Sequence, residues 1–454
     1  MVQVVDMGKH LFGTDGIRGI PGEYPLNDAT LVRVGFALGK HVSDSAGARA
    51  KVLVGRDTRE SGPHIAQLLA NGLTAAGVVP VSAGVLPTPG VAWLVHREGF
   101  AAGVVISASH NPYHDNGVKL ISSSGMKFPD AVEASIAAVI LSGEPFTVPP
   151  DVPSNDGKEA LYHDYLDGLR AAVLPGAKFA GMKIVLDCAN GAASDLAPEL
   201  FRSLGANVIA MNNSPDGRNI NADCGSLHPE HMQKRVVQEG AALGVAFDGD
   251  ADRAIFSNAA GRVVNGDGVL LAAGRYLKSA GKLRGDAIVG TTMSNLGLER
   301  ALESSGLKLI RTAVGDRYVL EEMQRIGANL GGEQSGHILF LDDATTGDGM
   351  LTAIKIASLV SICGSLESLT RDLKEFPQKI VNIRVESKPA LDSLPGVSGA
   401  LRQAETALGN SGRVVLRYSG TEPMVRVMVE AEHEKDVQRW TDSLAAAVKS
   451  EIGA

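Results

Sequence analysis

Cysteine is scarce in this 454-residue sequence, and the three that occur lie far apart. Cys188, Cys224 and Cys363 are odd in number and show no zinc-ligand spacing, which argues against a disulfide framework and a structural zinc site. A chain that relies on no disulfides is typical of a reducing compartment. We therefore expect a cytoplasmic protein.

Long apolar runs and an excess of positive charge are also lacking. No apolar stretch approaches the roughly 20 residues that span a bilayer. The segment Met1 to His10 contains Asp6 and no long apolar core, so no signal peptide is expected. With 43 basic and 51 acidic residues the formal charge is −8, which gives no overall field to attract nucleic acid or a membrane. We expect neither partner.

Short apolar runs that alternate with helical patterns are abundant. Hydrophobic residues make up 44% of the chain and charged residues 21%, as in globular proteins, and the length suggests roughly three domains. Alternating strands and helices predict parallel strands covered by helices. Strands are predicted over 51–55, 78–82, 102–106, 183–187, 243–247, 287–289 and 329–330, and helices over 62–76, 87–96, 196–204, 269–277 and 351–362.

The pattern changes after residue 377. Residues 380–385 and 424–430 alternate apolar and polar side chains, as half-exposed antiparallel strands do, and helices are expected near 396–408 and 434–450. The predicted fold is α/β: three successive α/β units, with mixed sheets flanked by helices, and a smaller α+β C-terminal domain around a central cleft. The expected boundaries are 1–150, 158–258, 259–373 and 374–454, with a polar linker over 145–158.

Three carboxylates stand at alternate positions in the segment Asp248-Gly-Asp-Ala-Asp-Arg253, directly after a predicted buried strand. Such close acidic groups repel one another unless a cation holds them, and a hard ion such as Mg²⁺ prefers oxygen ligands. A calcium EF-hand would need glycine at the sixth position and glutamate at the twelfth, where this chain has Arg253 and Ala259. The segment therefore indicates metal-assisted phosphate chemistry rather than calcium binding.

Two other interpretations of this segment remain open. An aspartyl-phosphate phosphatase also places an Asp-x-Asp pair after a strand, with the first aspartate as nucleophile, but that leaves Asp252 unexplained. An acidic turn that caps a helix over 251–255 is the structural alternative.

Four further segments combine hydroxyl, amide and charged side chains. Ser107-Ala-Ser109-His110-Asn-Pro112 follows a predicted strand, where open α/β sheets bind ligands, although such a run is also a common turn. The arginines, hydroxyls and glycine amide of 417–426 suit an anion. The carboxylate, amide and hydroxyl groups of 331–337 suit hydrogen bonds to sugar hydroxyls. Each of these two segments could also be a plain loop. The fourth segment is Phe12 to Gly19.

Together and in this order, the five segments resemble the α-D-phosphohexomutase superfamily over essentially the whole chain, and within it the bacterial phosphoglucosamine mutases. Three more motifs carry the narrower resemblance: 115–117, 219–226 and 315–318. Ala251 and Tyr418 depart from the family's pattern. The resemblance implies four domains and an intramolecular phosphotransferase of the isomerase class that acts in aminosugar metabolism and supplies cell-wall precursors.

The resemblance also implies roles for particular residues. Ser109 would carry a phosphoryl group and, with Asp248, Asp250 and Asp252, hold one Mg²⁺. Glucosamine 6-phosphate and glucosamine 1-phosphate would interconvert through a bisphosphorylated sugar, which also serves as activator. Lys119 would be the general base, although a surface lysine is the plainer interpretation. Proton-handling or electrostatic roles are implied for Arg18, His110, Arg253 and His337, sugar binding for Glu333 and Ser335, and phosphate binding for Arg417, Ser419, Gly420, Thr421 and Arg426.

Other functions fit parts of this evidence. A phosphomannomutase or phosphoglucomutase would use the same chemistry on another sugar, and the phosphatase described above would release phosphate without needing a bisphosphate. A sugar-phosphate sensor would not need the carboxylate set. The expected partner is a hexosamine phosphate, and the chain is expected to be a monomer or homodimer.

Overall fold

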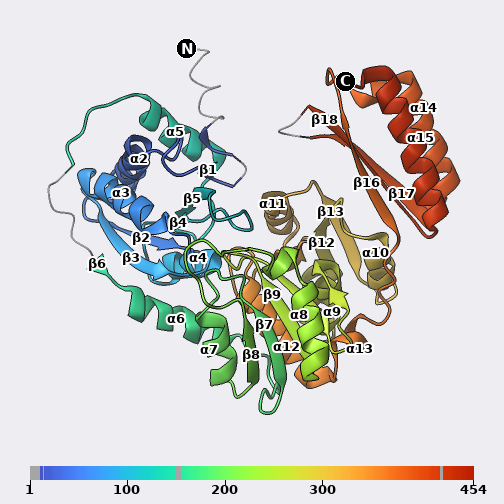
Figure 1. Ribbon diagram of the computed structural model, residues 1–454, viewed down its shortest axis with the longest axis horizontal. Helices are drawn as coiled ribbons and strands as arrows, with labels where there is room; N and C mark the ends of the chain where they lie inside the picture. The colour runs from blue at the N-terminus through green and yellow to red at the C-terminus, as the bar shows by residue number, and fades with distance from the viewer. Residues whose placement is uncertain (1–10, 14, 149–154, 420–422) are drawn as a thin grey trace.

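The computed structural model describes residues 11–13, 15–148, 155–419 and 423–454, and it contains four sheets in succession along the chain (Figure 1). The first sheet has the strand order β1-β5-β4-β2-β3-β6. Its strands and helices are β1 (Ile17–Gly19), α2 (Asp28–Ala46), β2 (Lys51–Arg56), α3 (Gly62–Ala75), β3 (Val79–Val85), α4 (Thr88–Arg97), β4 (Ala102–Ile106), β5 (Asn116–Ser122), α5 (Asp130–Leu141) and β6 (Asn155–Asp156).

The second unit contains a sheet of order β11-β10-β9-β7-β8. It is built from α6 (Lys158–Ala171), β7 (Lys183–Asp187), α7 (Leu196–Ser203), β8 (Asn207–Met211), α8 (Glu230–Glu239), β9 (Leu243–Phe247), β10 (Ala254–Asn258) and β11 (Val263–Val264), with a short 3-10 turn over Gly225–Leu227.

The third unit has the strand order β13-β12-β14-β15. Its elements are α9 (Gly266–Ser279), β12 (Ala287–Thr291), α10 (Leu296–Glu303), β13 (Lys308–Thr312), α11 (Asp316–Ile326), β14 (Leu330–Gly332), β15 (Ile338–Phe340), α12 (Gly349–Cys363) and α13 (Leu366–Thr370).

The fourth unit is a three-stranded antiparallel sheet of order β16-β18-β17. Two helices cover one face of this sheet, and Figure 1 shows the unit beside the third one and apart from the first. Its elements are β16 (Gln378–Arg384), α14 (Pro395–Leu408), β17 (Gly412–Tyr418), β18 (Met424–Ala431) and α15 (Glu434–Ile452).

The predicted fold class is confirmed, including the mixed character of the three larger sheets. In each of them a strand with a parallel partner is followed by an antiparallel neighbour: β4 by β5, β9 by β10 and β14 by β15. The loop that joins each of these pairs therefore starts at the carboxyl end of a parallel strand, the edge where α/β sheets bind ligands.

One local expectation is wrong, and one of the alternatives left open is excluded. The polar stretch 145–158 is not linker throughout, because β6 adds a short parallel strand beside β3. Residues 251–255 do not start a helix, because Ala254 onward forms β10, which pairs with β9. The aspartate segment therefore turns between two antiparallel strands and caps no helix.

The hydrophobic cores divide the molecule into a large block and a small unit. One cluster of buried side chains runs through the first three units, from Leu53 to Leu366. The fourth unit has its own cluster, in which Trp440 and Leu444 pack against the strands. The fourth unit is therefore a separately packed body.

Helix α12 lies at the centre of the large block and is buried nearly all round. It begins two residues before the predicted start at 351, because the Asp348 side chain accepts a hydrogen bond from the Leu351 amide at 2.9 Å and caps the helix. Among the residues that the structure describes, no helix is both long and apolar enough to cross a bilayer.

Candidate active site

Three loops that follow parallel strands supply most of the candidate site. We call them the serine loop (107–115, after β4), the aspartate loop (248–253, after β9) and the histidine loop (333–337, after β14). They belong to three successive units, so their side chains meet only through tertiary folding.

Ser109 and Asp248 are in direct contact across the boundary of the first two units. The Ser109 hydroxyl donates to Asp248 Oδ2 at 2.8 Å, although the two residues lie 139 positions apart. Ser109 is 2% exposed, and its φ of +52° lies in the left-handed region that non-glycine residues rarely adopt. His110 Nδ1 lies 3.3 Å from the same hydroxyl. Such backbone strain is concentrated at functional sites.

The three aspartates of the aspartate loop converge on one point. One oxygen from each of Asp248, Asp250 and Asp252 lies within 4.8 Å of the others, and all three residues are buried. Asp250 Oδ1 and Asp252 Oδ1 are buried without a hydrogen-bond partner among the described residues. Ala251 completes the turn at φ +55°, where a glycine would carry no steric cost.

This donor set fits a hard divalent cation. Buried carboxylate oxygens without partners are costly, because each loses its water and gains nothing in return. Burial, reinforced by the negative charges of Asp252 and Asp250, raises the pKa of Asp248 well above its ordinary value. A cation such as Mg²⁺ would relieve this repulsion and satisfy the free oxygens.

Lys119 reaches the aspartates from β5, the strand that pairs with β4 in the first sheet. Its ammonium lies 3.0 Å from Asp250 Oδ2 and 3.9 Å from Asp252 Oδ2, and the residue is 6% exposed, so it is not a surface lysine. Burial alone would lower the pKa of Lys119, but Asp15, Asp250 and Asp252 outweigh burial and hold the pKa well above its usual range. In this arrangement Lys119 carries its proton, so its role as general base stays a prediction.

Asp15 is a site residue to which the sequence analysis gave no role. Its carboxylate lies 3.0 Å from the Lys119 ammonium and accepts a hydrogen bond from Arg18 Nη2 at 2.7 Å. Burial raises the pKa of Asp15, but Lys119 and Arg18 outweigh it and lower the pKa to about 2. Asp15 therefore ties Arg18 and Lys119 into one charged network.

Arg253 and His337 close the other side of the aspartate loop. The Arg253 amide donates to Asp248 Oδ1 at 3.2 Å, and His337 Nδ1 lies 3.6 Å from Asp252 Oδ2. Burial lowers the pKa of His337, but Asp252 more than compensates and raises the pKa to about 9. The carboxylate of Asp252 therefore favours the protonated imidazole. Burial, together with the charges of Arg253 and Arg18, instead lowers the pKa of His110.

The histidine loop presents Glu333 and Ser335 differently. Glu333 is half-buried, and its Oε1 accepts a hydrogen bond from the Gly315 amide at 3.0 Å, next to the start of α11. Ser335 is exposed. Glu333 thus has a fixed position, whereas the Ser335 hydroxyl is open to a ligand.

Two arginines face each other on the fourth unit. Arg417 on β17 and Arg426 on β18 are direct cross-strand partners. Like charges in this position destabilise a sheet, and burial, assisted by Arg426, lowers the pKa of Arg417. Ser419 next to them is 3% exposed, and Gly420 and Thr421 lie outside the described residues. A pair of adjacent guanidinium groups is suited to a phosphate.

Polar contacts attach the fourth unit to the third. Arg413 donates to the carbonyls of Thr292 at 2.8 Å and Ser294 at 2.6 Å, and Glu430 accepts from the Leu296 amide at 2.9 Å. The two arginines of the fourth unit are thus held relative to the block that carries the other loops.

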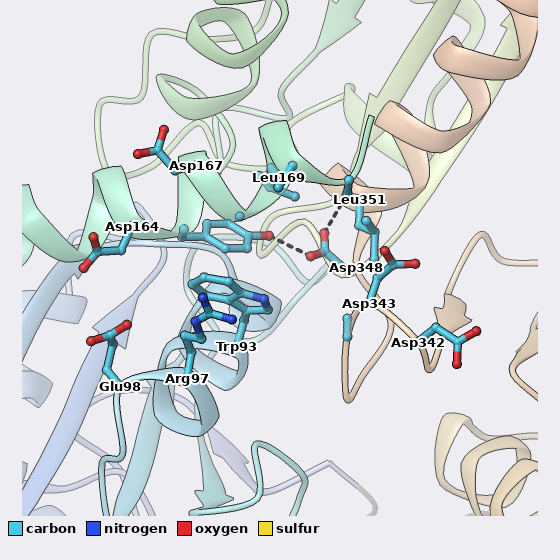
Figure 2. A pocket seen from close by; sticks show the side chains of 15 residues that line it. Trp93, Arg97, Glu98, Asp164, Asp167, Leu169, Asp342, Asp343, Asp348 and Leu351 are labelled. Carbon is cyan, nitrogen blue, oxygen red and sulfur yellow. Dashed lines mark hydrogen bonds between the residues drawn. The ribbon is translucent and has the colours of Figure 1, made fainter. Parts of the chain in front are cut away.

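A separate hollow of about 470 Å³ lies where α4, α6 and residues 342–351 meet (Figure 2). None of the described residues predicted for the site lines it. Three of its carboxylates already have a basic partner: Asp167 with Arg170, Asp342 with Arg284 and Asp343 with Lys355. The hollow touches the site only indirectly. Tyr165 donates to Asp348 at 2.8 Å, and Asp348 caps α12, whose Gly349 amide donates to Ala251 O at 3.0 Å.

Several residues around Ser109 were assigned no role from the sequence. Thr88 donates to Asp250 Oδ2 at 2.6 Å, Arg59 donates to four carbonyls of the serine loop, and Asn221 bridges Ser109 O and Asn111 O. Asp57 and Arg59 directly follow β2, a parallel neighbour of β4. The rule that ligand sites lie at such strand ends could have found them.

Models of four domains describe this chain in order. They are the phosphoglucomutase/phosphomannomutase alpha/beta/alpha domains I, II and III, over residues 9–145, 163–261 and 265–379, and the C-terminal domain of the same group, over 380–447. Four such units with a serine facing an aspartate trio define a phosphohexomutase, an isomerase that transfers a phosphoryl group within a sugar phosphate. The chain belongs to the phosphoglucomutase/phosphomannomutase family.

Its similarity to curated relatives extends over the full length. It is 51% identical over 448 residues to a phosphoglucosamine mutase of Solibacter usitatus, covering 98% of this chain and 100% of the relative. It is 49% identical over 460 residues to a phosphoglucosamine mutase of Koribacter versatilis, covering 98% of each.

Solved structures share the fold. A phosphoglucomutase/phosphomannomutase family protein of Burkholderia thailandensis superposes with a TM-score of 0.81 at 24% identity, over 98% of this chain and 99% of the other. The N-acetylphosphoglucosamine mutase of Aspergillus fumigatus, solved in complex with GlcNAc-6P and magnesium, gives a TM-score of 0.67 at 18% identity over 98% of both chains.

Proposed function

We propose that this chain interconverts glucosamine 6-phosphate and glucosamine 1-phosphate through a phosphoryl group carried on Ser109. The observation that carries the proposal is the 2.8 Å contact between the buried Ser109 hydroxyl and Asp248, beside two aspartates with free oxygens. The name shared by the full-length relatives supports glucosamine phosphate as the substrate.

The reaction has two balanced transfers. In the first, the P–Oγ bond of phosphorylated Ser109 breaks as a P–O1 bond forms, and the proton of the sugar hydroxyl passes to a base. The resulting glucosamine 1,6-bisphosphate turns over. In the second transfer its 6-phosphoryl group moves to the Ser109 oxygen and the sugar O6 takes a proton. The enzyme ends as it began.

We assign the metal to Asp248, Asp250, Asp252 and a phosphoryl oxygen on Ser109. Bound there, Mg²⁺ would neutralise charge on the transferring group. The chain itself supplies position and further charge. Arg253 and His337 lie beside Asp252, and Arg18 joins the same charged network through Asp15 and Lys119. We assign proton transfer to Lys119, or to His110, which lies next to the serine hydroxyl.

The distal phosphate would bind the fourth unit and the sugar hydroxyls the histidine loop. The Arg417–Arg426 pair, with Ser419, Gly420 and Thr421, must accept either phosphate of the bisphosphate as the sugar turns over. Glu333 and Ser335 would bind hydroxyls that lie similarly in both orientations. The domain boundaries, the cytoplasmic location and the monomer or homodimer state stay predictions.

Substrate preference tests this proposal. With Mg²⁺ and a catalytic amount of glucose 1,6-bisphosphate, we expect kcat/KM for glucosamine 6-phosphate to exceed that for glucose or mannose 6-phosphate at least about tenfold, a difference of the size that pocket contacts supply. Preference for glucose or mannose would assign the chain to the corresponding mutases of the same family. Release of inorganic phosphate without isomerisation would support the phosphatase that uses Asp248.

Substitution of Arg426 tests the phosphate site. We expect Arg426→Ala to raise the KM for glucosamine 6-phosphate by about 10-fold to 100-fold, the cost of a lost charged hydrogen bond, with a smaller effect on kcat. The substitution also removes the repulsion from Arg417 across the strand pair. The matched control is Arg402→Ala, an exposed arginine on α14 of the same unit. An unchanged KM would move the phosphate site elsewhere.

A further inference from the structure

The guanidinium of Arg59 is completely buried next to the serine loop. Arg59 is 0% exposed, and Nε donates to Asp57 Oδ2 at 2.8 Å in an ion pair that is itself shielded from solvent. Burying a charge is costly unless it is paired and fully hydrogen-bonded. The buried guanidinium therefore needs a full set of hydrogen-bond acceptors.

Its remaining donors all point at backbone carbonyls of the serine loop. Nη2 donates to Ser109 O at 3.0 Å and Asn111 O at 2.8 Å, and Nη1 donates to Pro112 O and, at 3.0 Å, to Asp115 O. With the bond from Nε, one planar group uses its complete set of donors. These carbonyls belong to a loop, so no neighbouring strand is in register to satisfy them.

The amide side of Ser109 is anchored to the same ion pair. The Ser109 amide donates to Ser107 Oγ at 2.9 Å, and that hydroxyl donates to Asp57 Oδ2 at 2.6 Å. Both backbone polar groups of Ser109 therefore lead, directly or through Ser107, to the Asp57–Arg59 pair.

The second unit completes this framework. Asn221 Nδ2 donates to Ser109 O at 2.9 Å and Asn111 O at 3.0 Å, the same two carbonyls that Arg59 Nη2 holds from within the first unit. Next to Arg59, the Thr58 hydroxyl donates to Asn190 O at 2.6 Å and also crosses to the second unit. The serine loop is thus fixed from both sides of the boundary that the catalytic contact spans.

We infer that Arg59 is a positioning residue: with Asp57 and Asn221 it holds Ser109 in its left-handed backbone conformation and so directs the hydroxyl at Asp248. Arg59 touches no reacting atom and acts through the backbone. The inference rests on the proposed function, because a fixed hydroxyl matters only if Ser109 carries the phosphoryl group.

The test uses Arg59→Lys, which keeps the charge but offers three donors on one nitrogen and cannot hold four carbonyls. We expect kcat to fall about 100-fold, the effect of a misplacement of the order of 1 Å. The KM for glucosamine 6-phosphate should stay within about twofold, because the sugar-binding groups lie in the other units. Phosphorylation of Ser109 by glucose 1,6-bisphosphate, followed by intact mass, should slow in parallel with kcat.

Arg56→Lys is the matched control. Arg56 lies three residues earlier, and its side chain donates only to Asp57 O among the hydrogen bonds described. Arg56→Lys therefore makes the same exchange of side chain without removing a hydrogen bond to the serine loop. We expect its kcat to equal that of the wild type within about twofold. If Arg59→Lys does not fold, Asn221→Ala tests the same framework without leaving a buried charge unpaired, and a selective fall in kcat is again expected.

The outcomes separate the inference from the proposed function. If the wild-type protein takes up no phosphate on Ser109, the proposed function fails, whatever Arg59 does. The inference alone is wrong if the wild type is phosphorylated but a correctly folded Arg59→Lys variant keeps full kcat. The same holds for a correctly folded Asn221→Ala variant where it is used instead. A rise in KM and a fall in kcat that are equally large in Arg59→Lys and Arg56→Lys would also overturn the inference, because that result indicates general loosening of the first unit.

Discussion

Ser109→Ala is expected to lower mutase turnover at least about 1,000-fold, because the oxygen that accepts and returns the phosphoryl group is removed. The fold should survive this change. Alanine can adopt the same backbone, and the substitution removes the hydrogen bond to Asp248 and the 3.3 Å contact with His110 Nδ1 from a residue held by its backbone groups. A melting temperature within a few degrees of the wild type is therefore expected.

The measurement combines steady-state kinetics with the intact mass of the protein. After incubation with glucose 1,6-bisphosphate, the wild type should carry one phosphoryl group that maps to residue 109, and the variant should carry none. Ser123→Ala, at an exposed serine in the turn after β5, serves as control and should retain activity. Full mutase turnover by Ser109→Ala would exclude the phosphoserine scheme.

Asp250→Asn is expected to raise the Mg²⁺ concentration needed for half-maximal activity at least about 100-fold. The reason is the free Oδ1, which together with the neighbouring carboxylates forms the only cluster of metal-ligating side chains found among the described residues. An amide in its place removes a unit of negative charge and replaces one of the two carboxylate oxygens with a donor that repels the cation.

The variant also tests whether the aspartates serve mainly to bind Lys119. Asp250 Oδ2 accepts from Lys119 and Thr88, and an asparagine oxygen can still do so. A purely structural role would therefore leave the Mg²⁺ dependence unchanged, and that result would exclude the proposed metal site at the three aspartates. Asp342→Asn, an exposed aspartate of the third unit, is the control; a Mg²⁺ titration of initial rates measures all three proteins.

The fold was largely predictable because its signals are local. Predicted strands 51–55, 102–106 and 183–187 match β2, β4 and β7 to within one residue, since buried parallel strands are short apolar runs. The antiparallel strand β10 was not predicted: the acidic residues before it resemble a helix cap, and only its pairing with β9 defines it as a strand. The short β6 has two residues and no pattern of its own.

The candidate site was predictable in its parts, but not in how they fit together. The aspartates stood out through their place after a strand, and Ser109 was assigned through the resemblance to the phosphohexomutases. Nothing local indicates that the serine hydroxyl meets Asp248 rather than Asp250. Asp15 and Arg59 were assigned no role because their function is defined by contacts to distant carbonyls and charges. Lys119 resembles a surface lysine on a strand, and only folding shows it to be buried among three carboxylates.

The close packing of the serine loop against the aspartate loop also restricts which residues the chain tolerates nearby. A β-carbon added at Gly249 would come within 2.5 Å of Ser109 O, and one added at Gly191 would come within 2.3 Å of Gly249 O. Three stretches of main chain from two units thus lie so close together that even a methyl group does not fit. In a library of all single substitutions, these two glycines should be as intolerant as the aspartates, although neither has a side chain that takes part in the chemistry.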